Sequence, residues 1–291
     1  MTGFSAQWLS LREPADHRAR NIKLRQEVLQ YFERTQPGLG KSTDTPFRIM
    51  DLGCGSGSNL RALAESFPAY QHWTLIDYDP ELLRAARTTL LQWADRAESE
   101  KAAGASNTTI QISKSGKHIT VSFVQEDLAK NIERVLSEKT DLVTAAAFFD
   151  LVSADWLVRF CLSLNVPLYT VLTYDGVEKW LPAHPADESV LRAFHSHQIT
   201  DKGFGLSAGP GAIEIMRTQL TARGFDVRMQ RSPWLLGSAD QPLMQALATG
   251  SANAVAQTNM VSTTELTSWL TARMQSLSCE IGHWDLFACP H

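Results

Sequence analysis

The chain has 291 residues, of which 44% are hydrophobic and 20% are charged. This size and composition allow a sizeable core in one large or two small domains, and they exclude a mainly disordered, collagen-like or coiled-coil chain. With 27 basic and 31 acidic residues the net charge is −4. The chain therefore lacks the overall basic character of a protein that wraps nucleic acid, although a local basic patch stays open.

Neither a metal site nor a secretory leader is indicated. The chain has four cysteines, far apart and without a CxxC pair: Cys54, Cys161, Cys279 and Cys289. We expect free thiols in a reducing cytoplasm, no metal and no disulfide framework. The first residues lack a basic segment followed by an apolar one, so no signal peptide is expected. Charged residues, the first of them Asp150, interrupt the most apolar stretch, 142–164, which predicts a buried strand and helix rather than a membrane span.

Strand and helix patterns alternate along most of the chain. A helical pattern over 15–35 comes first, and a short strand begins at 47. The next strand is predicted at 72–77, and two strands joined by a turn at 115–116 follow it. The remaining strands are predicted at 141–149, 166–176, 226–236 and 279–290. Helices are predicted after the glycine-rich turn and at 81–97, 131–140, 153–164, 212–225, 240–257 and 262–277.

This alternation predicts an α/β fold with a parallel sheet covered on both faces. Only 177–210, rich in His, Gly and Pro, breaks the rhythm. An open sheet of this kind binds ligands at the carboxyl ends of its strands, near the point where the strand order reverses. We therefore expect function in the loops that follow the strands: 53–57, 77–79, 127–128, 145–150 and 174 onward.

The sharpest local signal is DLGCGSG at 51–57. Its glycines allow a tight turn and the close approach of a ligand. The string follows a strand and opens a helix, and Asp77 ends the next strand, where a carboxylate can accept hydrogen bonds from ribose hydroxyls. A plain tight turn is the structural alternative.

The loop departs from a dinucleotide site. Its third glycine comes one residue earlier than in GxGxxG, and no GKS or GKT follows, which excludes a P-loop. Asp51 places a carboxylate near the ligand, where it would serve a pyrophosphate poorly and a cationic amino-acid group well.

The strings DLGCGSG, IDYDPELL and QEDL, in this order and spacing, resemble the class I S-adenosylmethionine-dependent methyltransferases. The resemblance covers about 47–175 by motif and extends to 291 by layout, and WLSLREPAD resembles a bacterial subgroup. It implies a Rossmann-like sheet of seven mostly parallel strands with helices on both faces. It also implies a helical lid at 1–45 and a methyltransferase domain at 46–291, with 177–210 inserted on the substrate side.

The resemblance also implies roles for single residues around S-adenosylmethionine. Gly53 and Gly55 would lie under its methionine and ribose, with Asp51 near its amino group. The remaining contacts would come from Asp77 (ribose), Tyr78 (adenine side), Asp127 (adenine amino group), Leu128 (a backbone amide) and Ala146 (the opposite side). An ordinary surface acid is the alternative for Asp127, and simple packing is the alternative for Tyr78.

Methyl transfer is a direct displacement that needs alignment in a dry pocket, and a general base only for an acidic acceptor. The place of an NPPY-like string after the fourth strand reads AAAFFDL, which weakens a nucleic-acid or glutamine-amide substrate. We therefore expect a cytoplasmic enzyme that methylates a small molecule, with no nucleic-acid or membrane partner and an open oligomeric state. A protein or RNA methyltransferase, or a non-catalytic protein that binds the cofactor, remains the alternative.

Candidates for the acceptor side follow the fifth strand and precede the first. The predicted catalytic residues are Tyr174, His195 and His197, and the predicted substrate-binding residues are Trp8, Arg12, Asp175 and Gln198. The two histidines share a face only if their segment is extended, and solvated loop residues are the alternative for both. Trp8 could equally be a core anchor, and Arg12 and Arg20 could lie on a solvated helix face.

Overall fold

The computed structural model describes residues 5–100, 109–201 and 203–290. The strands are β1 (Phe47–Leu52), β2 (Tyr70–Asp77), β3 (Arg96–Glu100), β4 (Thr109–Lys114), β5 (Lys117–Gln125), β6 (Leu142–Ala146), β7 (Leu168–Leu181), β8 (Phe225–Arg231), β9 (Trp234–Leu236) and β10 (Ser278–Pro290). The helices are α1 (Ala6–Ala19), α2 (Ile22–Thr35), α3 (Ser58–Leu63), α4 (Pro80–Trp93), α5 (Leu128–Leu136), α6 (Ala154–Ser163), α7 (Asp187–Gln198), α8 (Ala212–Ala222), α9 (Gln241–Ala256) and α10 (Thr263–Arg273), with single turns η1 (Phe149–Leu151), η2 (Gly209–Gly211) and η3 (Ser238–Asp240).

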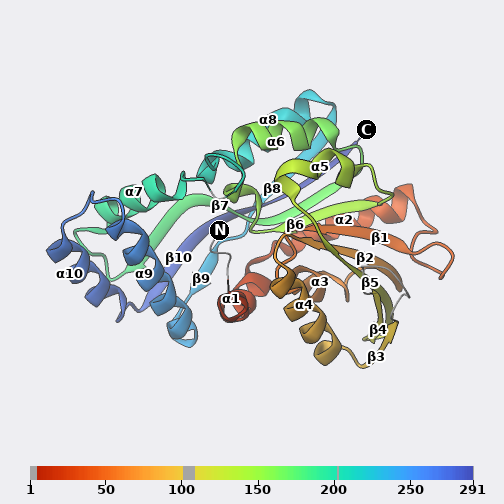
Figure 1. Ribbon diagram of the computed structural model, residues 1–291, viewed down its shortest axis with the longest axis horizontal. Coiled ribbons are helices and arrows are strands. Elements are labelled where there is room, and N and C mark those ends of the chain that lie inside the picture. The colour runs from red at the N-terminus through yellow and green to blue at the C-terminus, as the bar shows by residue number, and fades with distance from the viewer. Residues whose placement is uncertain (1–4, 101–108, 202, 291) are drawn as a thin grey trace.

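All strands belong to one sheet in the order β3-β4-β5-β2-β1-β6-β7-β10-β8, with β9 paired to β10 (Figure 1). The five central strands, β5, β2, β1, β6 and β7, run parallel. The predicted α/β class is confirmed, but within the described ranges the sheet has ten strands rather than seven. The hairpin of β3 and β4 extends one edge, and the strand predicted at 226–236 is split into β8 and β9.

The strand order reverses at β1. From β1 the chain moves outward through β2 to β5, and it then returns to the other side of β1 to form β6 and β7. The loops after β1 and β6 therefore diverge to opposite faces, which is the arrangement in which open α/β sheets bind ligands in a crevice at the carboxyl ends of their strands. The glycine loop follows β1, so the crevice is where the sequence predicts the site.

Side chains that alternate along the strands pack into two hydrophobic cores, one on each face of the sheet. In β1, Phe47 and Ile49 join a core with α2, α3 and α4, whereas Met50 and Leu52 join a core with α5, α6 and α8. Every second residue of a strand points to the same face, so this pattern requires a sheet covered on both faces. Asp51 shares the face of Ile49, toward α2 and α3.

Strands β7 and β10 are longer than their neighbours and pair with each other beyond the parallel sheet, as far as Leu181 and Ser278. Helices α7, α9 and α10 pack on this extension and form a second lobe, at the left in Figure 1. The sequence interpretation of 177–210 as aperiodic is wrong in part, because β7 continues to Leu181 and 187–198 is helix α7.

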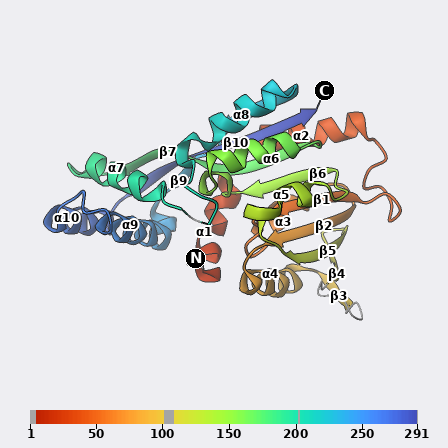
Figure 2. The ribbon, with the colours of Figure 1, turned by 45° about the horizontal axis from the view of Figure 1, so that its top comes forward.

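The helical pattern predicted at 15–35 is two helices, because the chain turns at Arg20 and Asn21. The side chain of Asn21 accepts a hydrogen bond from the backbone N–H of Leu24 and so caps α2. The buried residues of α2 pack on the sheet, whereas α1 lies between the parallel sheet and the second lobe (Figure 2).

The four cysteines are buried free thiols. Among the residues that the structure describes, no His, Cys, Asp or Glu cluster could hold a metal ion. No helix within the described ranges is long and apolar enough to cross a membrane.

Candidate functional site

The glycine loop folds as the sequence predicts, between β1 and α3. Gly53, Gly55 and Gly57 all have positive φ, at 63°, 53° and 75°, a region that side-chain-bearing residues rarely adopt. Asp77, at the end of β2, accepts hydrogen bonds from the backbone N–H of Gly55 (2.8 Å) and of Asp79 (3.0 Å). Asp77 therefore fixes the position of the loop, and burial raises the pKa of its carboxyl.

Two apolar side chains cover these glycines. A Cβ atom at residue 53 would lie 2.6 Å from Cδ2 of Phe148, and one at residue 55 would lie 2.9 Å from Cδ1 of Leu9. Leu9 belongs to α1 and Phe148 to the loop after β6. The loop is therefore closed in by the N-terminal helix on one side and by the neighbouring strand end on the other.

Asp51 is fully buried at the end of β1. Its Oδ1 accepts a hydrogen bond from Nδ2 of Asn59 (2.7 Å), and Oδ1 of Asn59 accepts one from Nη1 of Arg20 (2.7 Å). Oδ2 of Asp51 has no hydrogen-bond partner among the described residues. Burial raises the pKa of Asp51 to about 7, although Asn59 and Arg20 both act to lower it.

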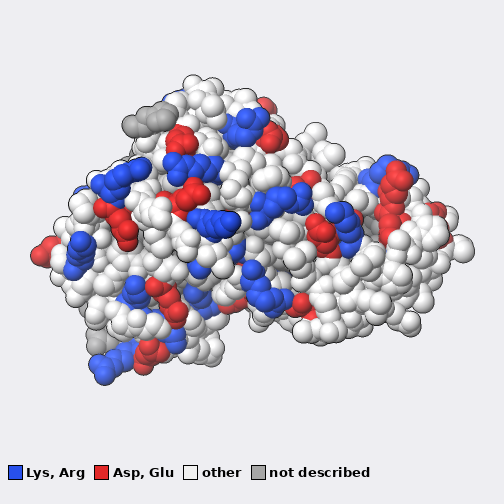
Figure 3. All heavy atoms as spheres, turned by 180° about the vertical axis from the view of Figure 1, so that it is seen from behind, with Lys and Arg blue, Asp and Glu red and all other residues white. Residues whose placement is uncertain are grey.

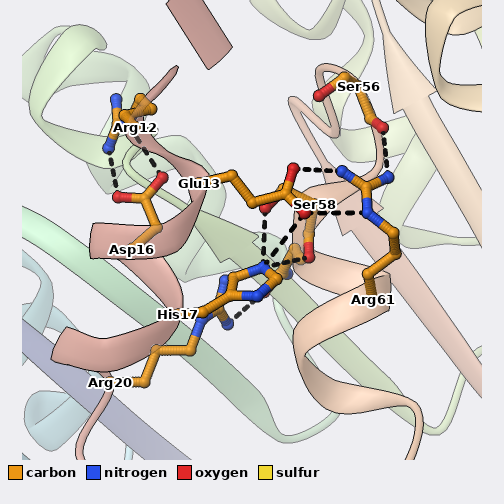
Figure 4. Close-up of polar contacts among 9 residues, drawn as sticks. Arg12, Glu13, Asp16, His17, Arg20, Ser56, Ser58 and Arg61 are labelled. Carbon is orange, nitrogen blue, oxygen red and sulfur yellow. Dashed lines mark hydrogen bonds and ion pairs between the residues drawn. The ribbon is translucent and has the colours of Figure 1, made fainter. Parts of the chain in front are cut away.

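Helix α1 is tied to α3 by polar contacts, and Arg61 of α3 connects it to the glycine loop (Figure 4). Glu13 forms a two-pronged ion pair with Arg61 of α3, in which the contact of Nε with Oε1 is 3.0 Å. Nη1 of Arg61 also donates to the carbonyl of Ser56 (2.9 Å). Nε2 of His17 lies 3.0 Å from Oγ of Ser58, and burial lowers the pKa of His17.

The other side of α1 reaches the second lobe through Asp16. Asp16 accepts from Nε (2.9 Å) and Nη2 (3.0 Å) of Arg12, and from Nε1 of Trp234 in β9 (3.1 Å). The guanidinium of Arg12 lies 4.9 Å from the centre of the Trp234 ring, within cation–π range. The alternative of a solvated helix face is wrong for Arg20, which is only 4% exposed.

On the acceptor side, the structure brings two predicted catalytic residues together. Oη of Tyr174 in β7 lies 3.0 Å from Nε2 of His195 in α7 and 3.2 Å from Oε1 of Glu178. Burial raises the pKa of Glu178 to about 6 and that of Tyr174 far above its ordinary value, whereas burial lowers the pKa of His195. This cluster is therefore a buried tyrosine between a carboxyl group and a neutral imidazole.

The remaining acceptor-side candidates lie apart from this cluster. His197 sits on a different face of α7, where Nε2 is 3.3 Å from Oε1 of Gln257. The Asp175 carboxylate packs against Gly282 at an irregularity of β10 and accepts from the N–H of Val177. Oε1 of Gln198 is buried without a partner in the described chain, and Trp8 is partly buried against the core.

The predicted adenine-side residues cluster at the ends of β2 and β5. Tyr78 is 55% exposed beside Asp77. Asp127 caps α5 through the N–H of Ala129 (3.1 Å) and pairs with Lys130 (2.8 Å). Leu128 is buried and its carbonyl accepts from Nε1 of Trp156, while Ala146 pairs with Val171 beside the crevice.

Asp150 and His283, which are both buried near Arg12, were not among the predicted site residues. Burial raises the pKa of Asp150 to about 6, although the charge of Arg12 acts to lower it. Burial lowers the pKa of His283 to about 3, and the charge of Arg12 adds to that lowering. Oδ1 of Asp150 and Nδ1 of His283 have no hydrogen-bond partner within the described part of the chain. An acid within the apolar run AAAFFDLV was the one sequence signal for Asp150.

The residues at the glycine loop fit S-adenosylmethionine. The unpartnered, buried oxygen of Asp51 suits an ammonium group, and Asp77 offers a carboxylate at the strand end. The positive φ of Gly53 and Gly55 serves the turn itself, because Phe148 and Leu9 lie over these two glycines.

Comparisons with known proteins agree with this geometry. The family model for a methyltransferase domain matches residues 50–155, which run from β1 to the start of α6. A search among curated proteins gives no match.

Several solved structures are similar over most of the chain. A phosphoethanolamine N-methyltransferase 2 from Haemonchus contortus, in complex with phosphomonomethylethanolamine and S-adenosylhomocysteine, is 13% identical and has a TM-score of 0.41; the match covers 100% of this chain and 59% of that one. A cyclopropane-fatty-acyl-phospholipid synthase-like protein from Lactobacillus casei is 15% identical, with a TM-score of 0.45 and coverage of 98% and 94%.

A methyltransferase from Thiobacillus denitrificans in complex with S-adenosylhomocysteine is 15% identical, with a TM-score of 0.42 and coverage of 99% and 98%. At these scores the likeness carries no argument about substrate. The family model and the geometry of the glycine loop lead to one conclusion: residues 50–155 carry a methyltransferase domain, and the loop within it offers Asp51 and Asp77 to S-adenosylmethionine.

Proposed function

We propose that this protein transfers a methyl group from S-adenosylmethionine to a small molecule that binds beneath α1. The observation that carries the proposal is the enclosure of the crevice. Helix α1 is tied to α3 through Glu13 and to β9 through Asp16, so it spans the strand ends where the methyl group would lie. An acceptor held under such a helix is small and shielded from water, which favours a displacement reaction.

The charge distribution supports a small molecule over nucleic acid. Figure 3 shows basic and acidic side chains side by side on the back of the molecule, without a continuous basic track on that face. Many of the arginines pair with acids, as Arg159 does with Glu133 and Arg228 with Asp226. A nucleic-acid surface needs a stripe of unpaired positive charge to meet phosphates.

In this proposal each part of the crevice has one task. When bound, S-adenosylmethionine supplies an electrophilic methyl group. Asp51 pairs with its ammonium group and Asp77 accepts from its ribose hydroxyls. Tyr78, Asp127 and Leu128 border the adenine, and Ala146 touches the cofactor from the opposite side. Tyr174 and His195 orient the acceptor, and Trp8 and Arg12 close the site from α1.

A labelling experiment tests this function. The protein is incubated with methyl-labelled S-adenosylmethionine and a cell extract split into small-molecule, RNA and protein fractions. Label is expected in the small-molecule fraction. Label only in RNA or protein would contradict the proposal, and so would binding of the cofactor without any transfer.

Variants on the acceptor side extend this test. Tyr174→Phe and His195→Ala should reduce label transfer while the affinity for S-adenosylmethionine stays unchanged, because the two sites are adjacent but distinct. His197→Ala is a matched control, since the side chain contacts Gln257 instead of Tyr174. Full transfer by both acceptor-side variants would indicate that the acceptor binds instead in the part of the crevice around Trp8 and Arg12.

A further inference from the structure

Asp150 lies in the loop that separates the place proposed for the cofactor from the place proposed for the acceptor. It lies in η1, directly after β6, and β6 is flanked by β1 with the glycine loop and by β7 with Tyr174. Two residues earlier, Phe148 packs over Gly53. Asp150 therefore stands between the place proposed for the cofactor and the residues proposed for the acceptor.

The hydrogen bonds of this carboxyl group are incomplete. Asp150 is only 6% exposed, and its interactions include backbone hydrogen bonds at residues 150 and 174. Its Oδ1 has no partner among the described residues. A buried carboxylate oxygen without a donor is costly, and a catalytic role is one of the explanations for such a group in a native protein.

The surroundings of Asp150 select the kind of group that could supply the donor. The charge of Arg12 acts on Asp150, but Arg12 already holds Asp16 with two nitrogens and stacks on Trp234. His283 is neutral, because burial lowers its pKa to about 3. The crevice near Asp150 therefore offers a carboxylate oxygen that lacks a donor, and it would repel an acceptor that is itself a carboxylate.

We propose that Asp150 contacts the methyl acceptor, and that the acceptor presents an N–H or O–H group to the free carboxylate oxygen. The inference rests on the proposed function. The acceptor atom bonds to the methyl carbon, the carbon–sulfur bond breaks with its electron pair left on sulfur, and the proton that the acceptor loses passes to Asp150. A pKa of about 6 leaves Asp150 ionised at neutral pH and still basic enough to take this proton.

The test uses sinefungin, an analogue of the cofactor in which a carbon that bears an amine replaces the methylsulfonium group. Its ammonium group would lie where the methyl group meets the acceptor, so no natural substrate is needed. Calorimetric titration should show that sinefungin binds the wild-type protein about tenfold more tightly than S-adenosylhomocysteine, because a charge-assisted hydrogen bond forms. Asp150→Asn and Asp150→Ser should remove this preference and leave the affinity for S-adenosylhomocysteine unchanged.

Asp155→Asn is the matched control, because Asp155 is an exposed acid five residues further along. It should keep the preference for sinefungin. Two results would overturn the role of Asp150 without touching the proposed function. The wild type could bind both compounds equally, or an Asp150 variant that still binds S-adenosylhomocysteine could keep the preference for sinefungin. A wild-type protein that binds neither compound would instead overturn the proposed function.

Discussion

Asp77 combines two tasks that compete for the same carboxylate. Both oxygens already accept from backbone N–H groups, one in the glycine loop and one before α4. A carboxylate has about four lone-pair sites, so it can still accept from ribose hydroxyls. The residue that would bind the cofactor therefore also shapes the loop beneath it, and its removal should affect both.

Asp77→Ala should lower the affinity for S-adenosylmethionine by at least about tenfold, because hydrogen bonds to a charged group are worth roughly 1.5–3 kcal/mol each. Calorimetry measures the affinity, and denaturant titration measures the free energy of unfolding. Asp79→Ala is the control, since it removes only the cap of α4. Unchanged affinity in a folded Asp77→Ala protein would show that Asp77 does not hold the ribose.

Asp51 gives the stability of the ligand-free protein a pH dependence of known sign. Its pKa is about 7 in the folded chain and about 4 in the unfolded chain, so between these values the folded state binds more protons. This group therefore makes the free energy of unfolding fall as pH rises from 4 to 7. Asp51→Asn removes that contribution. The free energy of unfolding of Asp51→Asn, taken relative to that of wild type, should therefore be higher above pH 7 than below pH 5.

Denaturant titrations of both proteins across this range measure the difference. Asp155→Asn should follow the wild-type profile, because it removes an exposed acid. A constant difference between wild type and Asp51→Asn at every pH would contradict the raised pKa. Asp51→Asn should also weaken the binding of S-adenosylmethionine, since the ammonium group loses its partner.

Helix α1 is the element on which the site depends most. It covers Gly55 with Leu9, holds α3 through Glu13 and holds β9 through Asp16. The ion pair of Glu13 with Arg61 is well shielded, since the Arg61 side chain is 5% exposed. Loss of one partner would leave a buried charge unpaired, which is far costlier than loss of a surface pair.

Glu13→Ala should loosen α1 without unfolding the sheet. Hydrogen exchange of the amides in 6–19 is expected to become at least about tenfold faster, because the lost contacts are worth roughly 1.5–3 kcal/mol. Glu33→Ala, on the exposed face of α2, is the control and should leave α1 protected. Unchanged exchange of α1 in Glu13→Ala would show that the ion pair does not hold the helix.

At the scale of the whole molecule, the sequence predicts what depends on neighbours in the chain. The glycine loop, Asp77 and most helices follow from local patterns of apolar residues and turns, and the structure contains them. The hydrogen bonds that hold α1 in place join residues that are 48 and 218 positions apart in the sequence. The extension of β7 depends on pairing with β10, near the end of the chain. No local pattern encodes such contacts.

The same reason explains the residues that were missed. Asp150 lies in an apolar run, and only the packed structure shows that one of its oxygens lacks a donor. Helix α7 was missed because its His- and Ser-rich end weakens the helical pattern, although Val190 and Ala193 bury its inner face. Tertiary packing here decides both the element and the site.

The central claim is that the glycine loop binds S-adenosylmethionine beneath α1. Calorimetric titration of the purified protein with S-adenosylmethionine, and separately with NAD, tests it most directly. We expect saturable binding of S-adenosylmethionine, no binding of NAD, and clearly weaker binding of S-adenosylmethionine by Asp77→Ala. Binding of NAD together with no response to S-adenosylmethionine would contradict it.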